Sequence, residues 1–190
     1  MYNVAVGHSA GTAVTTGINN TLIGGTAGDA LTVGIENVAV GYNALGVDDV
    51  GAKNVAIGAF ALEKQNAPTG TANSFLNVAV GHSAGSEIVE GYYNTLIGSN
   101  AGDNITSGQS NIIIGQGIDA ASPTAHSQLN IGNWITGATN GSLSVSAADG
   151  FADNAFAMRV ENLEATDDRS YGLYIQAGST ATDSALHVYE

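Results

Sequence analysis

The sequence predicts an all-β protein whose chain winds into a repeat β-solenoid, a parallel β-roll with rungs of about 17 residues. Three observations lead to this prediction. Asparagine recurs at a nearly fixed spacing, each asparagine opens a short apolar segment that ends at glycine, and a further glycine follows in most of the repeats. A fixed period of this kind is typical of stacked repeats, in which each unit contacts only its neighbours.

The predicted rungs begin at eight asparagines, which are separated by 17, 17, 17, 23, 17, 17 and 19 residues. Equivalent asparagines are expected to stack in a structural ladder that satisfies their side-chain amides and nearby backbone groups. At about 4.8 Å per rung, eight rungs would form a rod about 40 Å long. The ladder residues are Asn3, Asn20, Asn37, Asn54, Asn77, Asn94, Asn111 and Asn130.

The three residues after each asparagine are expected to form a strand. Its first and third positions, such as Val38 and Val40, are β-branched and are expected to face the core, because residues two apart in a strand share a face. The middle position is apolar as well, which predicts burial on both faces. One coil has too little chain to cover its own outside, so the middle column is expected to contact other chains in a homotrimer. This inter-chain column is Ala5, Leu22, Ala39, Ala56, Ala79, Leu96 and Ile113.

The remainder of each rung contains two turns, because glycine recurs four and fourteen residues after the asparagine. A weaker second strand is expected between these turns, with Val14, Leu31, Ile88 and Ile105 at equivalent positions. Six extra residues within 65–76 predict a protruding loop. The Ser122-Pro123 region is expected to lengthen the last full repeat in the same way.

The predicted solenoid shaft covers residues 1–135, and the small-residue segment 136–150 is interpreted as a connection. Residues 151–190 hold three strand-like segments and are predicted to form a short, intertwined fibrous β module. The repeats begin at residue 3 without a signal peptide, and the last segment resembles a strand cut short. The chain is therefore expected to be an excerpt of a longer protein, with the C-terminal module truncated.

Composition narrows the possible partners. Seventeen acidic and four basic residues give a net charge of −13. This argues against nucleic acid, whose phosphates need Lys and Arg, and against a polybasic membrane patch. No apolar run is long enough for a transmembrane helix, so membrane insertion is not expected. The chain has no cysteine and therefore no disulfide. No catalytic residue, metal or cofactor is predicted.

The repeat N-[VT]-[AL]-[VI]-G-x-x-A-G resembles the β-roll heads of trimeric autotransporter adhesins and the repeat shafts of bacteriophage tail fibres over about residues 3–135. The segments 155–160, 171–175 and 185–188 look like a stretch of phage tail fibres and tailspikes associated with intertwined three-chain β structure. The usual adhesin repeat is nearer 14 residues than 17. The resemblance therefore implies a homotrimeric tail fibre.

Two motifs suggest chemistry but have simpler explanations. His8-Ser9 and His82-Ser83 lie in G-x-S-x-G segments, the nucleophile elbow of α/β hydrolases. Equivalent repeats replace the serine with Thr or Asn, so a turn is the preferred interpretation. In a trimer, His8 and His82 could each form a ring of three that binds an ion, although an exposed turn histidine is the simpler interpretation. Asp29 and Asp103 are likewise interpreted as turn-capping carboxylates rather than calcium ligands.

The expected function is structural and not enzymatic: a segment of a phage tail fibre on the virion that supports binding to a host-surface glycan or outer-membrane receptor. Other tail-fibre or baseplate proteins are the expected further partners. The alternative is the head of a bacterial surface adhesin. A less favoured alternative is a tailspike depolymerase that uses paired carboxylates, for which only Asp48-Asp49 and Asp167-Asp168 are candidates. The candidates for stacking on sugars, with packing at an interface as the alternative, are Tyr42, Phe60, Tyr92, Tyr93 and Trp134. The receptor-binding residues are not predicted.

Overall fold

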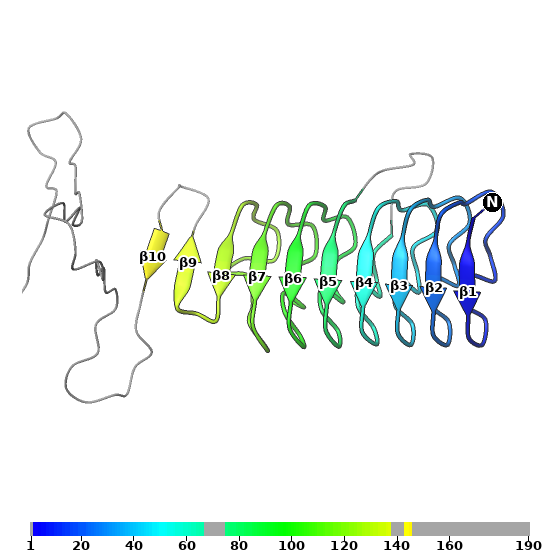
Figure 1. Cartoon of the computed structure of the whole chain (residues 1–190). Helices are drawn as coiled ribbons and strands as arrows, with labels where there is room; N and C mark the ends of the chain where they lie inside the picture. The colour runs from blue at the N-terminus through cyan, green and yellow to red at the C-terminus, as the bar shows by residue number, and fades with distance from the viewer. Residues whose placement is uncertain (1, 67–74, 138–142, 146–190) are drawn as a thin grey trace, which may run out of the picture. The chain divides into compact units, whose positions relative to one another are not determined.

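The computed structural model describes residues 2–66, 75–137 and 143–145. All of them belong to the first of two compact units, Met1–Ala148, and the second unit is Asp149–Glu190. The predicted loop tip and the predicted module at 151–190 lie outside the described residues. Ten short strands form one sheet in sequence order (Figure 1). They are β1 (Val4–Val6), β2 (Thr21–Ile23), β3 (Val38–Val40), β4 (Val55–Ile57), β5 (Val78–Val80), β6 (Thr95–Ile97), β7 (Ile112–Ile114), β8 (Leu129–Ile131), β9 (Ile135–Gly137) and β10 (Leu143–Val145).

The predicted parallel β-solenoid is confirmed. Strands β1 to β8 pair in parallel with their immediate neighbours, and equivalent residues face each other in every pair, as Ala39 faces Ala56. The described residues contain no helix. Each rung therefore contributes one strand, and Figure 1 shows the strands side by side with their loops returning behind them.

The stack ends in a change of direction. Strand β9 runs antiparallel to β8, and β10 runs antiparallel to β9. These two strands fall partly within residues 136–150, which we had interpreted as a connection. The first part of that segment instead extends the sheet as a hairpin, because Ile131 and Ile135 pair across the turn at residues 132–134.

The asparagine ladder is present from Asn3 to Asn111. The Oδ1 atom of each asparagine accepts the backbone N–H of its equivalent in the next rung, at 2.9–3.1 Å. Most of the side-chain amides also donate to the carbonyl of the glycine fourteen residues ahead, as Asn20 does to Gly34 at 2.8 Å. Six of the ladder residues are buried: Asn20, Asn37, Asn54, Asn77, Asn94 and Asn111. The ladder thus satisfies polar groups that water cannot reach.

The predicted eighth ladder residue, Asn130, was wrong. The backbone N–H of Gln128 donates to Asn111 Oδ1 at 2.8 Å, so Gln128 occupies the ladder position. Asn130 lies opposite Ile113 in the middle of β8, and its side chain binds Asn133 and the Asp119 carbonyl. The last rung therefore begins at residue 128, and the spacing stays at 17. The Ser122-Pro123 region does not lengthen the repeat.

The predicted faces of the strands were reversed. The middle residue of β2 to β7 is fully buried within the single chain, whereas the first and third residues are partly or fully exposed. The column we had assigned to inter-chain contacts therefore lines the chain's own core. Only Ala5, in the end strand β1, is exposed. The physical reason is that the rest of each rung folds back over the middle residue and covers it.

The glycines at the end of each strand stack directly on one another. Gly81 has a φ of +140°, and a Cβ built on it would lie 2.3 Å from the carbonyl oxygen of Gly98 in the next rung. The same overlap recurs at equivalent glycines from Gly7 to Gly98. Only glycine can therefore occupy this corner, where the backbones of neighbouring rungs make their closest approach.

The predicted second strand is absent, since turns and bends follow the glycine corner in the described rungs. Leu31, Ile88 and Ile105 are nevertheless buried, and Val14 packs against the same cluster. The core is thus formed by the middle strand column, an alanine column after the corner, and this third column. The alanine column is Ala10, Ala27, Ala44, Ala61, Ala84 and Ala101.

The rungs that begin at Asn37 and Asn54 have a different core from their neighbours. Eight residues after the ladder asparagine they carry Leu45 and Leu62, where four other rungs carry glycine. Both leucines are buried in a left-handed conformation, with φ of +52° and +50°. In the rung before them, a Cβ on Gly28 would lie 2.8 Å from Leu22. In these three rungs the large Leu22 is thus combined with glycine, and the small Ala39 and Ala56 are combined with leucine, which offsets the change in core volume.

Candidate functional site: the outer face of the sheet

The most extensive feature of the surface is the outer face of the parallel sheet. Each of β1 to β8 presents its first and third residues there, and nearly all of them are apolar. Several of these side chains are moderately exposed, for example Ile57 at 39% and Ile112 at 42%, and others are partly buried. The face consists of Val4, Val6, Thr21, Ile23, Val38, Val40, Val55, Ile57, Val78, Val80, Thr95, Ile97, Ile112, Ile114, Leu129 and Ile131.

The outer face is continuous because the strands are in register. Val38 pairs with Val55, and Val40 pairs with Ile57, so the two columns of side chains run without offset from rung to rung. Neither column contains a charged residue. Large contiguous apolar patches on protein surfaces are typical of interaction sites. The outer face offers apolar side chains and, at Thr21 and Thr95, two hydroxyl groups.

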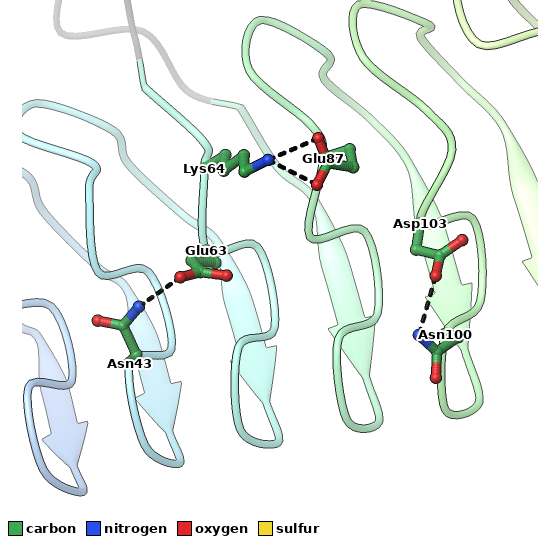
Figure 2. Close-up of polar contacts among 6 residues, drawn as sticks. All are labelled: Asn43, Glu63, Lys64, Glu87, Asn100 and Asp103. Carbon is green, nitrogen blue, oxygen red and sulfur yellow. Dashed lines mark hydrogen bonds and ion pairs between the residues drawn. The ribbon is translucent and has the colours of Figure 1, made fainter.

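The polar contacts of the surface lie elsewhere, on the loops that follow the glycine corner (Figure 2). Lys64 forms an ion pair with Glu87 at 2.6 Å, both being about half exposed. Asn43 donates to Glu63 at 2.8 Å, and Asn100 donates to Asp103 at 2.9 Å. Two of these pairs link neighbouring rungs. The loops thus carry the polar surface, and the strands carry the apolar one.

Comparisons with protein-family models, curated proteins and solved structures found no match to this chain. The described part of the chain has no helix that could span a membrane. Among the described residues, no group of three or more His, Cys, Asp or Glu side chains is positioned to hold a metal ion.

The structure places the two G-x-S-x-G segments in turns. Ser9 and Ser83 both have positive φ, at +58° and +54°. The hydroxyl group of each serine forms a hydrogen bond with the histidine before it, with Oγ to Nδ1 distances of 3.2 and 3.0 Å. The turns continue into further turns, not into the helix that a nucleophile elbow requires. The turn interpretation of these segments is consistent with this geometry.

Of the two acidic candidate pairs, the structure describes Asp48 and Asp49. Asp48 is fully buried, where its carboxylate accepts hydrogen bonds from Gly51 N–H at 2.8 Å and Gln65 at 2.9 Å. Burial raises the pKa of the Asp48 carboxyl above its usual value. A substrate on the surface could not reach this group. The second candidate pair, residues 167–168, lies outside the described residues.

Aromatic side chains gather in one short strip beside the glycine corner. Tyr42 contacts Phe60 edge to face at a centroid distance of 5.4 Å, and Phe60 contacts His82 at 5.7 Å. Tyr92 and Tyr93 form a separate pair at 5.0 Å. Trp134 stands alone, 64% exposed, in the turn between β8 and β9. The sequence pattern singled out these residues, but their contact across three rungs could be seen only in the structure.

Proposed function

We propose that the chain is a structural segment of a homotrimeric fibre, and specifically of a bacteriophage tail fibre that projects from the virion and supports attachment to the host surface. The observation that carries this proposal is the continuous apolar outer face. A single solenoid closes its own core through the middle column, yet it leaves two further apolar columns uncovered. A partner that covers them is the simplest physical resolution.

A second copy of the same chain is the best-matched partner. The outer face repeats at the spacing of the rungs, about 4.8 Å, and an identical chain laid alongside has the same repeat over the same length. Oligomers of identical chains with closed symmetry are the commonest assemblies. The resemblance of the repeat to tail-fibre shafts and adhesin heads favours three chains about a shared axis.

The proposed role is mechanical. Eight parallel rungs span about 34 Å between the first and the last strand, and every rung is held by the same ladder and the same glycine corner. Three such rods joined through their outer faces would resist bending and hold three copies of a receptor-binding tip at one distance from the particle. Threefold presentation increases avidity without any additional contact. No catalytic step is required.

The experiment is a measurement of the oligomeric state of the protein by sedimentation equilibrium. A trimer is expected for the wild-type chain. Ile57→Glu would place a charge in the middle of the outer face and is expected to yield monomers. Val47→Glu is the matched control, because Val47 is equally exposed, at 45%, but lies in the loop region and not on the sheet. A wild-type monomer, or equal effects of the two variants, would refute the proposal.

Attachment is tested separately. Electron microscopy of phage particles labelled with antibodies against this chain should place the label along a tail fibre. Labelling of a bacterial cell surface instead would favour the adhesin alternative, whose repeat also resembles this one. A trimer that labels neither would leave the oligomer intact and exclude both attachment roles.

A further inference from the structure

The near identity of the rungs creates a problem of register. Residues 3–29 and 77–103 share most of their sequence at an offset of 74 residues, and every rung offers the same asparagine, glycine and strand to the next. The backbone hydrogen bonds between rungs do not depend on which rung supplies them. A rung that looped out during folding would therefore leave its neighbours able to pair with each other.

Two of the described rungs differ from the others because they carry a buried polar side chain at a core position that is apolar in other rungs. The position concerned lies eleven residues after the ladder asparagine. In three other rungs it holds a buried apolar side chain, namely Leu31, Ile88 or Ile105. The rungs that begin at Asn37 and Asn54 carry Asp48 and Gln65 at this position, both with 0% exposure. These are the same two rungs that carry Leu45 and Leu62 in place of glycine.

The two polar side chains satisfy each other and the surrounding ladder. Gln65 donates from Nε2 to Asp48 Oδ2 at 2.9 Å, and Asp48 Oδ1 accepts the N–H of Gly51 at 2.8 Å. Gln65 Oε1 accepts from the side-chain amide of Asn77 at 2.8 Å. Three consecutive rungs are thus connected by one chain of hydrogen bonds. The last of these bonds also joins the residues on either side of the segment that contains the six extra residues.

We propose that Asp48 and Gln65 form a register lock that determines which rungs stack on one another and where the longer rung is looped. The lock is complete only when the rungs beginning at Asn37, Asn54 and Asn77 are immediate neighbours. If the rung of Gln65 were looped out, Asp48 would face Ile88, and its buried Oδ2 atom would lose the hydrogen bond from Gln65. Breaking a buried polar pair in this way is strongly unfavourable.

The lock acts through specificity and not through added stability. An apolar pair of similar size would pack in the same column as Leu31 and Ile88 without a desolvation penalty, and such replacements often leave stability unchanged or raise it. An aliphatic side chain at position 48 would also be compatible with Ile88 in a slipped stack. Such a side chain would therefore preserve the fold but would no longer distinguish the native stack from the slipped one.

The test uses cysteine pairs as reporters, which is straightforward because the chain has no cysteine of its own. Lys64 and Glu87 are in contact on neighbouring rungs (Figure 2), so Lys64→Cys with Glu87→Cys reports the native stack. Val47 holds the same position one rung earlier. Val47→Cys with Glu87→Cys spans two rungs, about 10 Å, and can cross-link only if the intervening rung is looped out, since a disulfide needs Cα atoms within about 7 Å.

Each reporter is refolded from denaturant and oxidised, with and without the double substitution Asp48→Leu and Gln65→Met. With the wild-type pair, the native reporter is expected to cross-link and the two-rung reporter to remain reduced. With the double substitution, the two-rung intramolecular cross-link is expected to rise at least about tenfold. Ile105→Leu, an apolar exchange in the same column, is the control and should give no such increase.

Two results would overturn the register lock. One is a double variant that folds into the native stack with the same background of two-rung cross-link as the wild type. The other is a double variant that no longer folds, as judged by circular dichroism and thermal unfolding, because the polar pair would then supply stability and not specificity. Both readouts are independent of whether the chain is a monomer or a trimer.

Discussion

Asn37 is held to Asn20 at two points, since its backbone N–H and its side-chain amide both donate to the Oδ1 atom of Asn20, at 3.0 and 3.2 Å. The backbone N–H of Asn54 is held by Asn37 in the same way, at 3.0 Å. One amide side chain thus accepts from the rung ahead of it and donates to the rung behind it. Consecutive rungs are therefore coupled through their side chains as well as through the sheet.

Removal of one buried ladder side chain should lower stability substantially. Asn37→Ala leaves the N–H of Asn54 and the carbonyl of Gly51 without their partners inside the core. We expect the free energy of unfolding to fall by about 3 kcal/mol, measured by denaturant titration. Asn3→Ala at the half-buried end of the ladder should cost less than half as much, because water can replace its contacts. Equal costs at the two positions would contradict the ladder argument.

The glycine corner should tolerate no side chain. Gly81→Ala would bring a methyl group against the carbonyl of Gly98 at a φ of +140°, and a loss of roughly 3 kcal/mol is expected from the clash and the strain together. Gly117→Ala is the control. Its φ is +61° but nothing lies within 4 Å of the added Cβ, so only about 1 kcal/mol should be lost. Thermal unfolding of both variants tests the difference.

The compensation between core positions should appear in a double-mutant cycle. Gly28→Leu would clash with Leu22, and Leu22→Ala would leave a cavity. The two together would reproduce the combination of Ala39 and Leu45 found one rung later. We expect the double variant to be more stable than Gly28→Leu alone, with a favourable coupling of about 1 kcal/mol or more. Additive losses would show that the two positions do not share the same space.

The buried carboxylate of Asp48 predicts a specific pH dependence. Burial raises its pKa in the folded state above the usual 3.8, so the folded protein binds this proton more tightly than the unfolded chain does. The associated stabilisation is present below the usual pKa and is lost as the pH rises through the folded-state pKa. The stability of wild type relative to Asp48→Asn should therefore decrease as the pH is raised from below 3.8 through the folded-state pKa.

Denaturant titrations of both proteins over this range provide the measurement, and other carboxylates cancel in the comparison. A relative stability that does not change with pH, or one that increases, would show that Asp48 is not held in the environment described.

The period of the sequence predicted the solenoid but not the direction of its faces. Alternation in a strand indicates which residues share a face, not which face is inside. We assigned the bulky Val38 and Val40 to the core, whereas the small Ala39 is the buried residue. The core beside the strand is narrow because the rung folds back closely at Gly41. The replacement of Leu22 by Ala39 in the next rung coincides with the replacement of Gly28 by Leu45. This exchange of volume was the sequence signal for the interior, and the assignment of the faces did not use it.

The eighth rung was misplaced for a different reason. Residue identity alone placed the eighth rung at Asn130. The constant spacing of 17 residues from Asn111 instead leads to Gln128. The glutamine carries the same amide on a longer side chain, and it retains both the contact with Asn111 and a backbone carbonyl partner. The polar pair of Asp48 and Gln65 could not be foreseen either, because their contact depends on which rungs are neighbours.

The stacked glycine corner has a consequence for how a shaft of this kind changes in evolution. Each rung meets the next through the same glycine, the same amide and the same strand, so a copied rung finds both of its neighbours already complementary to it. Duplication of one rung or of several lengthens the molecule without any new interface. The 74-residue duplication in this chain is consistent with such growth, and the length of the solenoid becomes a heritable quantity that varies in whole rungs.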